Sequence, residues 1–95
     1  MTFEQFIKSL DEKEPPSPLS GALKSLWYDA NGGWDKAHQI ADDIGGPDGN
    51  WVHAYLHRKE GDQWNANYWY RRAGRESPIV SLDVEWENLL SFFFR

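Results

Sequence analysis

Two histidines and a glutamate stand at a spacing that suits metal binding. His53, His57 and Glu60 follow one another at i, i+4 and i+7. On a helix these positions are neighbours along one face. Two imidazoles and a carboxylate placed in this way can hold a divalent cation. His38, from the preceding predicted helix, adds a third nitrogen if the two helices pack antiparallel.

Three interpretations of these residues stay open. In the first, a divalent metal is held by His38, His53, His57 and Glu60, with oxygen from Asp35 or Asp42, and a small hydrolase activates a metal-bound water. In the second, a histidine with a pKa near neutrality does acid–base chemistry without metal. In the third, the histidines are only solvated or hydrogen-bonded within the protein. The chain has no H-E-x-x-H motif.

The residues from His57 to Arg75 combine cationic and aromatic side chains. The stretch holds five cations, two asparagines and four aromatic rings. Arginine beside an aromatic ring suits a carboxylate or a phosphate, because its fork donates paired hydrogen bonds and its plane stacks. The alternative is internal pairing of Arg58 or Arg72 with acids that are close in sequence, namely Glu60, Asp62 or Glu76.

Our leading hypothesis is a small binding module whose cleft holds an anionic small molecule or an acidic peptide. Arginine would recognise charge, the rings would stack, and histidine and asparagine would supply hydrogen bonds. The residues expected to line the cleft are His38, His53, His57, Arg58, Glu60, Asn65, Tyr68, Arg71 and Arg72.

Composition narrows the class of protein. The 95 residues suit one domain, residues 1–95, and there is no cysteine. The net charge of −5 argues against general nucleic-acid binding, which depends on neutralising phosphates. The start of the chain lacks the pattern of a signal peptide. The apolar run "LLSFFF" is far shorter than the roughly 20 residues that span a bilayer. We expect a soluble, cytoplasmic protein with no membrane partner.

The hydrophobic periodicity predicts an all-α fold of about six short helices. Thr2 opens a capping box for the first helix, which ends at "EPPSP". Ser17 is expected to cap the second helix with Pro18 in its first turn. "GGPDGN", from Gly45 to Asn50, is expected to be a turn. Ser81 is expected to cap the last helix; the third, fourth and fifth are predicted at residues 34–44, 50–60 and 63–73.

A weak internal repeat suggests two stacked helical hairpins. Residues 32–45 align with 61–74 at an offset of 29. The second copy resembles a tetratricopeptide or Sel1-like repeat in its small, aromatic and proline positions, which are Ala54, Gly61, Ala66, Tyr70, Ala73 and Pro78. This alignment turns His53 and His57 towards the fifth helix, whereas a simple helical wheel turns them away from the main apolar face.

The middle of the chain resembles a family of small, uncharacterised microbial proteins. That family carries an "AH" segment followed by H-A-x-x-H-R-x-E-G-D-x-x-N-A-x-Y-W-x-R-R-x-G. The resemblance implies a shared site but names no chemistry. The matching positions are His38, His53, Ala54, His57, Arg58, Glu60, Gly61, Asp62, Asn65, Ala66, Tyr68, Trp69, Arg71, Arg72 and Gly74.

Phe92 and Phe94 fall outside the apolar stripe of the last predicted helix. Two uses are open for them. They add a second packing face to the core, or they form the surface of a structural homodimer.

Overall fold

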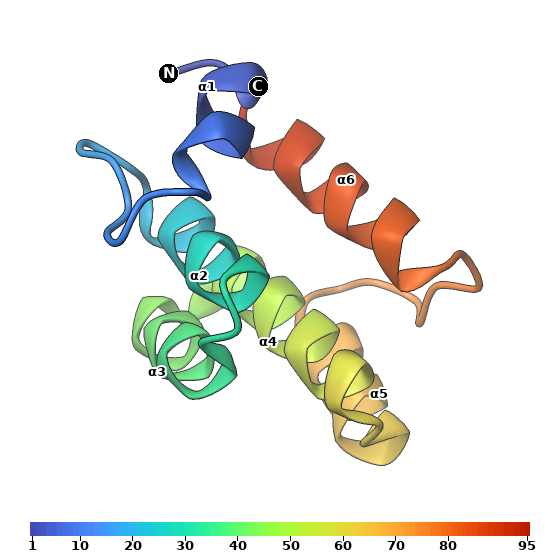
Figure 1. Cartoon of the computed structure of the whole chain (residues 1–95). Coiled ribbons are helices and arrows are strands. Elements are labelled where there is room, and N and C mark those ends of the chain that lie inside the picture. Colours follow the sequence, from blue (N-terminus) through green and yellow to red (C-terminus); the bar gives the residue numbers. More distant parts are fainter.

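The computed structural model describes all residues from 1 to 95 and contains six helices and no strand. The predicted all-α fold with about six helices is therefore confirmed (Figure 1). The helices are α1 (Phe3–Ser9), α2 (Gly21–Ala30), α3 (Trp34–Ile44), α4 (Gly46–Glu60), α5 (Gln63–Arg72) and α6 (Leu82–Phe93). None of them combines the length and the apolar composition that crossing a bilayer requires.

Helix α4 is the centre of the molecule. It packs against α2, α3, α5 and α6, and Figure 1 shows it running through the middle of the bundle. Seven consecutive residues, Trp51 to His57, are buried. A helix that is buried on every side has no solvent face for polar side chains. The histidines of this helix must therefore meet other parts of the protein.

The helices α2 and α3 form one hairpin, and α4 and α5 form another, with α3 packed against α4 between them. The second hairpin turns at Gly61, whose φ of 92° lies in the left-handed region that favours glycine. Beyond it, the Asp62 N–H donates to the His57 carbonyl at 2.9 Å. The Asp62 side chain then caps α5 by accepting from the Asn65 N–H at 3.2 Å.

Two predicted helix starts are wrong. Ser17 does not cap α2; Ser20 does, because its Oγ accepts from the Leu23 N–H at 3.3 Å, and the helix begins at Gly21. "GGPDGN" is not a turn but the first turn of α4, which begins at Gly46. Pro47 fits there because the first turn leaves N–H groups unpaired in any case, so a missing N–H is no loss.

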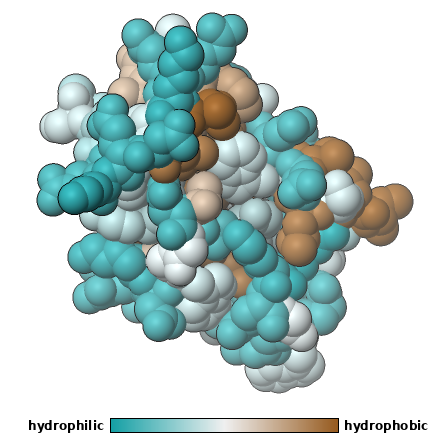
Figure 2. All heavy atoms as spheres, in the orientation of Figure 1, coloured by the Kyte–Doolittle hydropathy of each residue, from teal (hydrophilic) through white to brown (hydrophobic).

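The aromatic end of α6 closes the core against α1 and α4. The ring of Phe94 lies 5.6 Å from that of Phe6, and the ring of Phe92 lies 5.4 Å from that of Trp51. Both phenylalanines are partly buried and pack against the core, as the first of the two uses predicts. The exposed apolar atoms at the right edge of Figure 2 belong to another region, the segment between α5 and α6, where Ile79 is exposed. The homodimer stays a prediction.

Candidate functional site: a three-histidine cluster

Small residues bring α3 close to α4 beside the histidines. Ala37 and Ala41 of α3 are buried, at 0% and 1% exposure. Gly49 of α4 lies so close to Ala41 that an added Cβ would stand 2.8 Å from the Ala41 carbonyl oxygen. This close approach places His38, one turn before Ala41, opposite the histidines of α4.

His38, His53 and His57 converge on one point, and we call them the histidine cluster. The ring centroid of His38 lies 4.3 Å from that of His53 and 5.1 Å from that of His57. The centroids of His53 and His57 lie 4.9 Å apart. One ring nitrogen from each residue lies within 4.8 Å of the others. His53 and His57 are buried, with 3% and 8% exposure, and His38 is half-buried.

Two tryptophans hold the cluster from either side. The ring of Trp69 stacks on His53 at a centroid distance of 3.8 Å, and that of Trp34 stacks on His38 at 5.0 Å. Trp34 is itself fixed, because its indole N–H donates to the Leu56 carbonyl at 2.8 Å. The imidazoles are therefore oriented by packing before any ligand is present.

Burial keeps two of the histidines neutral. Desolvation lowers the pKa of His53 to about 4, and the neighbouring His38 and His57 add to the effect. Desolvation and the charge of a protonated His57 lower the pKa of His38 as well. The opposing Asp42 is exposed and lies 4.0 Å from Nδ1 of His53, so it offsets only part of the shift. At neutral pH both imidazoles have a free lone pair.

His57 is held by a carboxylate. Its Nδ1 lies 2.6 Å from Oε2 of Glu60. An ionised carboxylate can only accept, so Nδ1 donates in this contact, and Nε2 is the nitrogen that could bind a metal ion. His57, Glu60 and Asp62 form a second and more open group, in which one possible ligand atom from each residue lies within 4.8 Å of the others. Its carboxylates are already used, because Asp62 caps α5 through Asn65.

The structure does not bring the predicted cleft residues to one place. Arg58 points to another side of α4, where Nη1 donates to Oε1 of Glu85 at 2.8 Å and Nη2 donates to the Val80 carbonyl. Arg58 is thus paired internally, but with a glutamate of α6 rather than with an acid close in sequence. Asn65 donates to the Asp62 carboxylate at 3.1 Å. It supports the helix cap instead of pointing to an open cleft.

The remaining predicted residues divide between two faces of α5. The guanidinium of Arg72 lies 5.2 Å from the ring of Trp69 and 5.6 Å from that of Tyr68, beside the histidine cluster. Arg71 lines a different hollow, together with Trp64 and other residues. The single cleft predicted from the sequence is therefore two separate regions.

Neither the stacking of Trp34 and Trp69 on the histidines nor the pairing of Glu85 with Arg58 was predicted from the sequence. For Trp34 a signal exists, since it precedes His38 by four residues on the same helix. For Trp69 and Glu85 no local signal exists, because their partners lie on other helices.

The surface has hollows of about 590, 400 and 230 Å³, and no histidine lines any of them. None of the three hollows therefore adjoins the histidine cluster. The close spacing of the three rings suits a ligand of atomic size.

Comparisons with protein-family models, with curated proteins and with solved structures find no match to this chain. The resemblances to the microbial motif family and to tetratricopeptide repeats stay predictions.

Proposed function

We propose that the protein binds one divalent transition-metal ion through His38, His53 and His57. The observation that carries this proposal is the convergence of three imidazoles from two helices, with their ring nitrogens within 4.8 Å of one another. Apart from the Glu60 contact of His57, no protein group hydrogen-bonds to these rings. No side-chain nitrogen or oxygen that is fully shut off from solvent lacks a partner, so the unbonded ring nitrogens keep some contact with solvent, from which an ion could reach them.

The geometry is near that of a bound ion. Nitrogens at 2.0–2.1 Å from a tetrahedral zinc lie about 3.4 Å apart. Ring nitrogens already within 4.8 Å of one another need to close by at most about 1.4 Å, which ring rotation can supply without moving a helix.

The protonation states also favour metal. A ligand imidazole must be neutral, so protons compete with the ion. The lowered pKa values of His53 and His38 remove most of that competition at neutral pH. Folding has thus already removed most of the water from these rings, so metal binding does not have to do so.

Glu60 completes a pattern common at metal sites. A ligating histidine usually donates its other N–H to a carboxylate, which fixes the tautomer and makes the ligand nitrogen more basic. The His57–Glu60 pair at 2.6 Å has this form. Glu60, which the sequence places among the metal ligands, is in this proposal the partner of a ligand. Imidazole nitrogen suits zinc, copper, nickel and iron.

The metal-dependent hydrolase is the second candidate. Three protein ligands leave a coordination position at which water can be activated. We propose binding rather than hydrolysis because no hollow for an organic substrate adjoins the histidines. The cytoplasmic location stays a prediction.

The test is titration of metal-free protein with Zn²⁺ by calorimetry, and with Co²⁺ by visible absorption. We expect one ion per chain and a tetrahedral cobalt spectrum. His53→Phe keeps an aromatic ring on Trp69 but removes a ligand, so affinity should fall by at least about 100-fold. Glu60→Gln should weaken binding by about 10–100-fold, because it removes only the partner of a ligand.

Glu87→Gln is the matched control for Glu60→Gln, since Glu87 is exposed on α6 and makes no ion pair. It should bind metal as the wild type does. Circular dichroism on each variant separates lost affinity from lost fold. The proposal is wrong if the wild type binds neither ion, or if folded His53→Phe binds both with unchanged affinity.

A further inference from the structure

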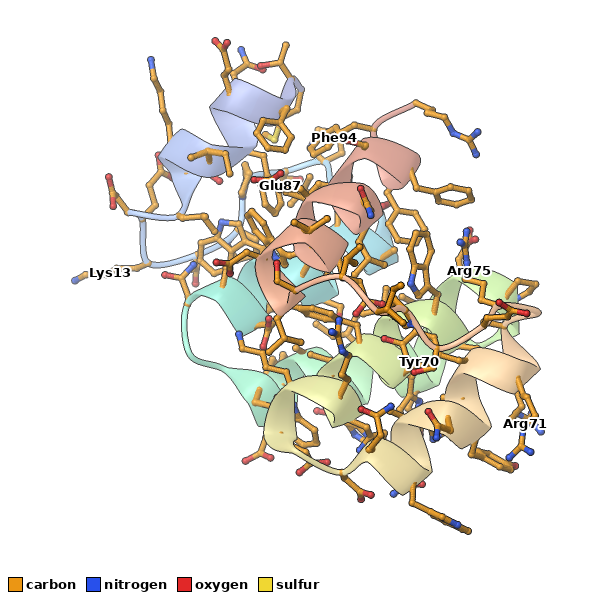
Figure 3. All side chains as sticks on the ribbon, turned by 90° about the vertical axis from the view of Figure 1, so that its right-hand side faces the viewer. Lys13, Tyr70, Arg71, Arg75, Glu87 and Phe94 are labelled. Carbon is orange, nitrogen blue, oxygen red and sulfur yellow. The ribbon has the colours of Figure 1, made fainter.

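A second polar region lies on the other face of α5, away from the histidines. A hollow of about 400 Å³ is lined by Trp64, Asn67, Arg71, Arg75 and Ser77, among others. It shares Tyr70, Arg75 and Glu76 with the neighbouring hollow of about 590 Å³. Figure 3 shows Tyr70, Arg71 and Arg75 on the same side of the molecule. We call the smaller hollow the arginine hollow.

Both arginines of this hollow lack an acidic partner. The four ion pairs of the protein use Arg58, Lys59 and two histidines, but neither Arg71 nor Arg75. Neither guanidinium donates a hydrogen bond to any protein group. All of their N–H donors therefore remain available.

Arg75 is nevertheless held in place. Its guanidinium lies 3.4 Å from the ring centroid of Trp51 and 5.3 Å from that of Phe92. Stacking on tryptophan fixes the plane of the fork without using its N–H groups. The charge is thus oriented in advance, which lowers the entropy lost when a ligand binds.

Gln63 orients two further side chains with donor groups, Asn67 and Ser77. Its Nε2 donates to Oδ1 of Asn67 at 2.8 Å and to Oγ of Ser77 at 3.1 Å. The acceptor atoms of both residues are therefore occupied, and the Asn67 amide N–H groups and the Ser77 O–H remain to donate. Glu76 is the one acid that lines the hollow, and it is exposed.

We propose that the arginine hollow binds a phosphate monoester carrying a planar group. Free donors of four side chains surround one space, so the complementary ligand is rich in acceptor oxygens. Two guanidiniums match the two negative charges of a phosphate monoester. The planar group would stack on Trp64, which is 80% exposed at the wall of the hollow. The net charge of −5 repels anions in general, so recognition has to come from these local donors.

This site uses none of the histidine-cluster residues, so it can fail without affecting the proposed metal site, and the reverse also holds. The experiment is calorimetric titration of protein stripped of metal on a chelating resin, with phenyl phosphate and with inorganic phosphate at low, matched ionic strength. Metal removal excludes binding of phosphate to an ion. We expect both to bind at one site, and phenyl phosphate to bind more tightly.

Three variants assign the binding. Arg71→Gln should weaken both ligands by at least about tenfold, since it removes a charged donor. Arg75→Lys keeps the charge but loses the fork, and should also weaken both. Trp64→Ala should abolish the advantage of phenyl phosphate over inorganic phosphate and leave inorganic phosphate unchanged. Lys13→Gln removes one positive charge far from the hollow (Figure 3) and should change neither affinity.

The proposal is overturned if phenyl phosphate does not bind, or if Arg71→Gln weakens it no more than Lys13→Gln does. It is also overturned if succinate or an acidic peptide binds more tightly than phenyl phosphate, because the site would then recognise carboxylates. Far-ultraviolet circular dichroism of each variant confirms that it is folded.

Discussion

Two polar clusters lie on different sides of α4, and they differ in how many of their polar atoms are hydrogen-bonded within the protein. In one of them, which we call the Glu85 cluster, the carboxylate of Glu85 is 2% exposed. It accepts from Arg58 at 2.8 Å, from the Tyr70 hydroxyl at 2.6 Å and from the Trp51 indole at 3.2 Å. One negative charge meets one positive charge, and the cluster is closed.

The histidine cluster is less completely buried, since His38 is half-buried, and it is not closed. The rings of His38 and His53 stack on Trp34 and Trp69. Their nitrogens make no hydrogen bond within the protein and keep some contact with solvent. A closed set of polar groups stabilises one arrangement of helices and has no bond left for a ligand. A set that is held in place mainly by packing keeps ring nitrogens available for a ligand. The comparison therefore predicts that breaking the first cluster affects stability, and breaking the second affects binding.

The largest expected effect comes from opening the closed cluster. Glu85→Gln leaves the part-buried Arg58 charge without a counter-charge, and breaking a buried pair costs about 3–5 kcal/mol. Urea denaturation followed by tryptophan fluorescence measures the loss. Glu87→Gln, on the exposed face of the same helix, should change stability by less than about 0.5 kcal/mol. Equal effects of the two substitutions would contradict the distinction between the clusters.

The next effect concerns pH. Because the folded pKa of His53 is lowered to about 4 from 6.5, the unfolded chain binds a proton first as pH falls. Stability is therefore complete above pH 6.5 and decreases between pH 6.5 and about 4. From this residue alone the loss is roughly 3 kcal/mol.

Urea denaturation of metal-free protein across this pH range measures the slope. His53 is faced by His38, His57 and Asp42, and acidic residues elsewhere titrate in the same range, so the useful quantity is the difference between two proteins. The wild type should lose more stability on acidification than His53→Phe. Parallel curves for the two proteins would show that His53 is not held neutral by the fold.

Local sequence signals predicted the elements of this fold well. The third helix lies at residues 34–44 as expected, and Thr2 and Ser81 cap their helices. Helix capping and hydrophobic periodicity depend on residues that are close in sequence, so they can be recognised directly in the sequence. The errors at Ser17 and at Gly46 have the same local character. Pro18 was placed inside a helix that begins only at Gly21, and Gly46 and Pro47 were placed outside a helix that they begin.

Partners across helices were harder to predict. The sequence offered Glu60, Asp62 and Glu76 as partners for Arg58, and the structure pairs it with Glu85, which is 27 residues away. The three histidines were predicted to meet if the helices packed suitably, and Ala37, Ala41 and Gly49 permit that packing. Two orientations were predicted for His53 and His57, and each describes part of the result, because residues 51–57 of α4 are buried on every side of the helix.

The smallest expected effect tests whether the Glu85 cluster gains from each of its donors. Tyr70→Phe removes one hydroxyl that donates to Glu85 while Arg58 and Trp51 still bind it, so stability should fall by about 1–2 kcal/mol. Tyr55→Phe is the matched control, because Tyr55 is also buried at 3% exposure but its hydroxyl makes no hydrogen bond within the protein. Tyr55→Phe should lower the free energy of unfolding by less than about 0.5 kcal/mol. If urea denaturation gives the same value for both tyrosines, the hydroxyl of Tyr70 adds nothing, and the stability of the closed cluster comes from the Arg58 and Trp51 contacts with Glu85.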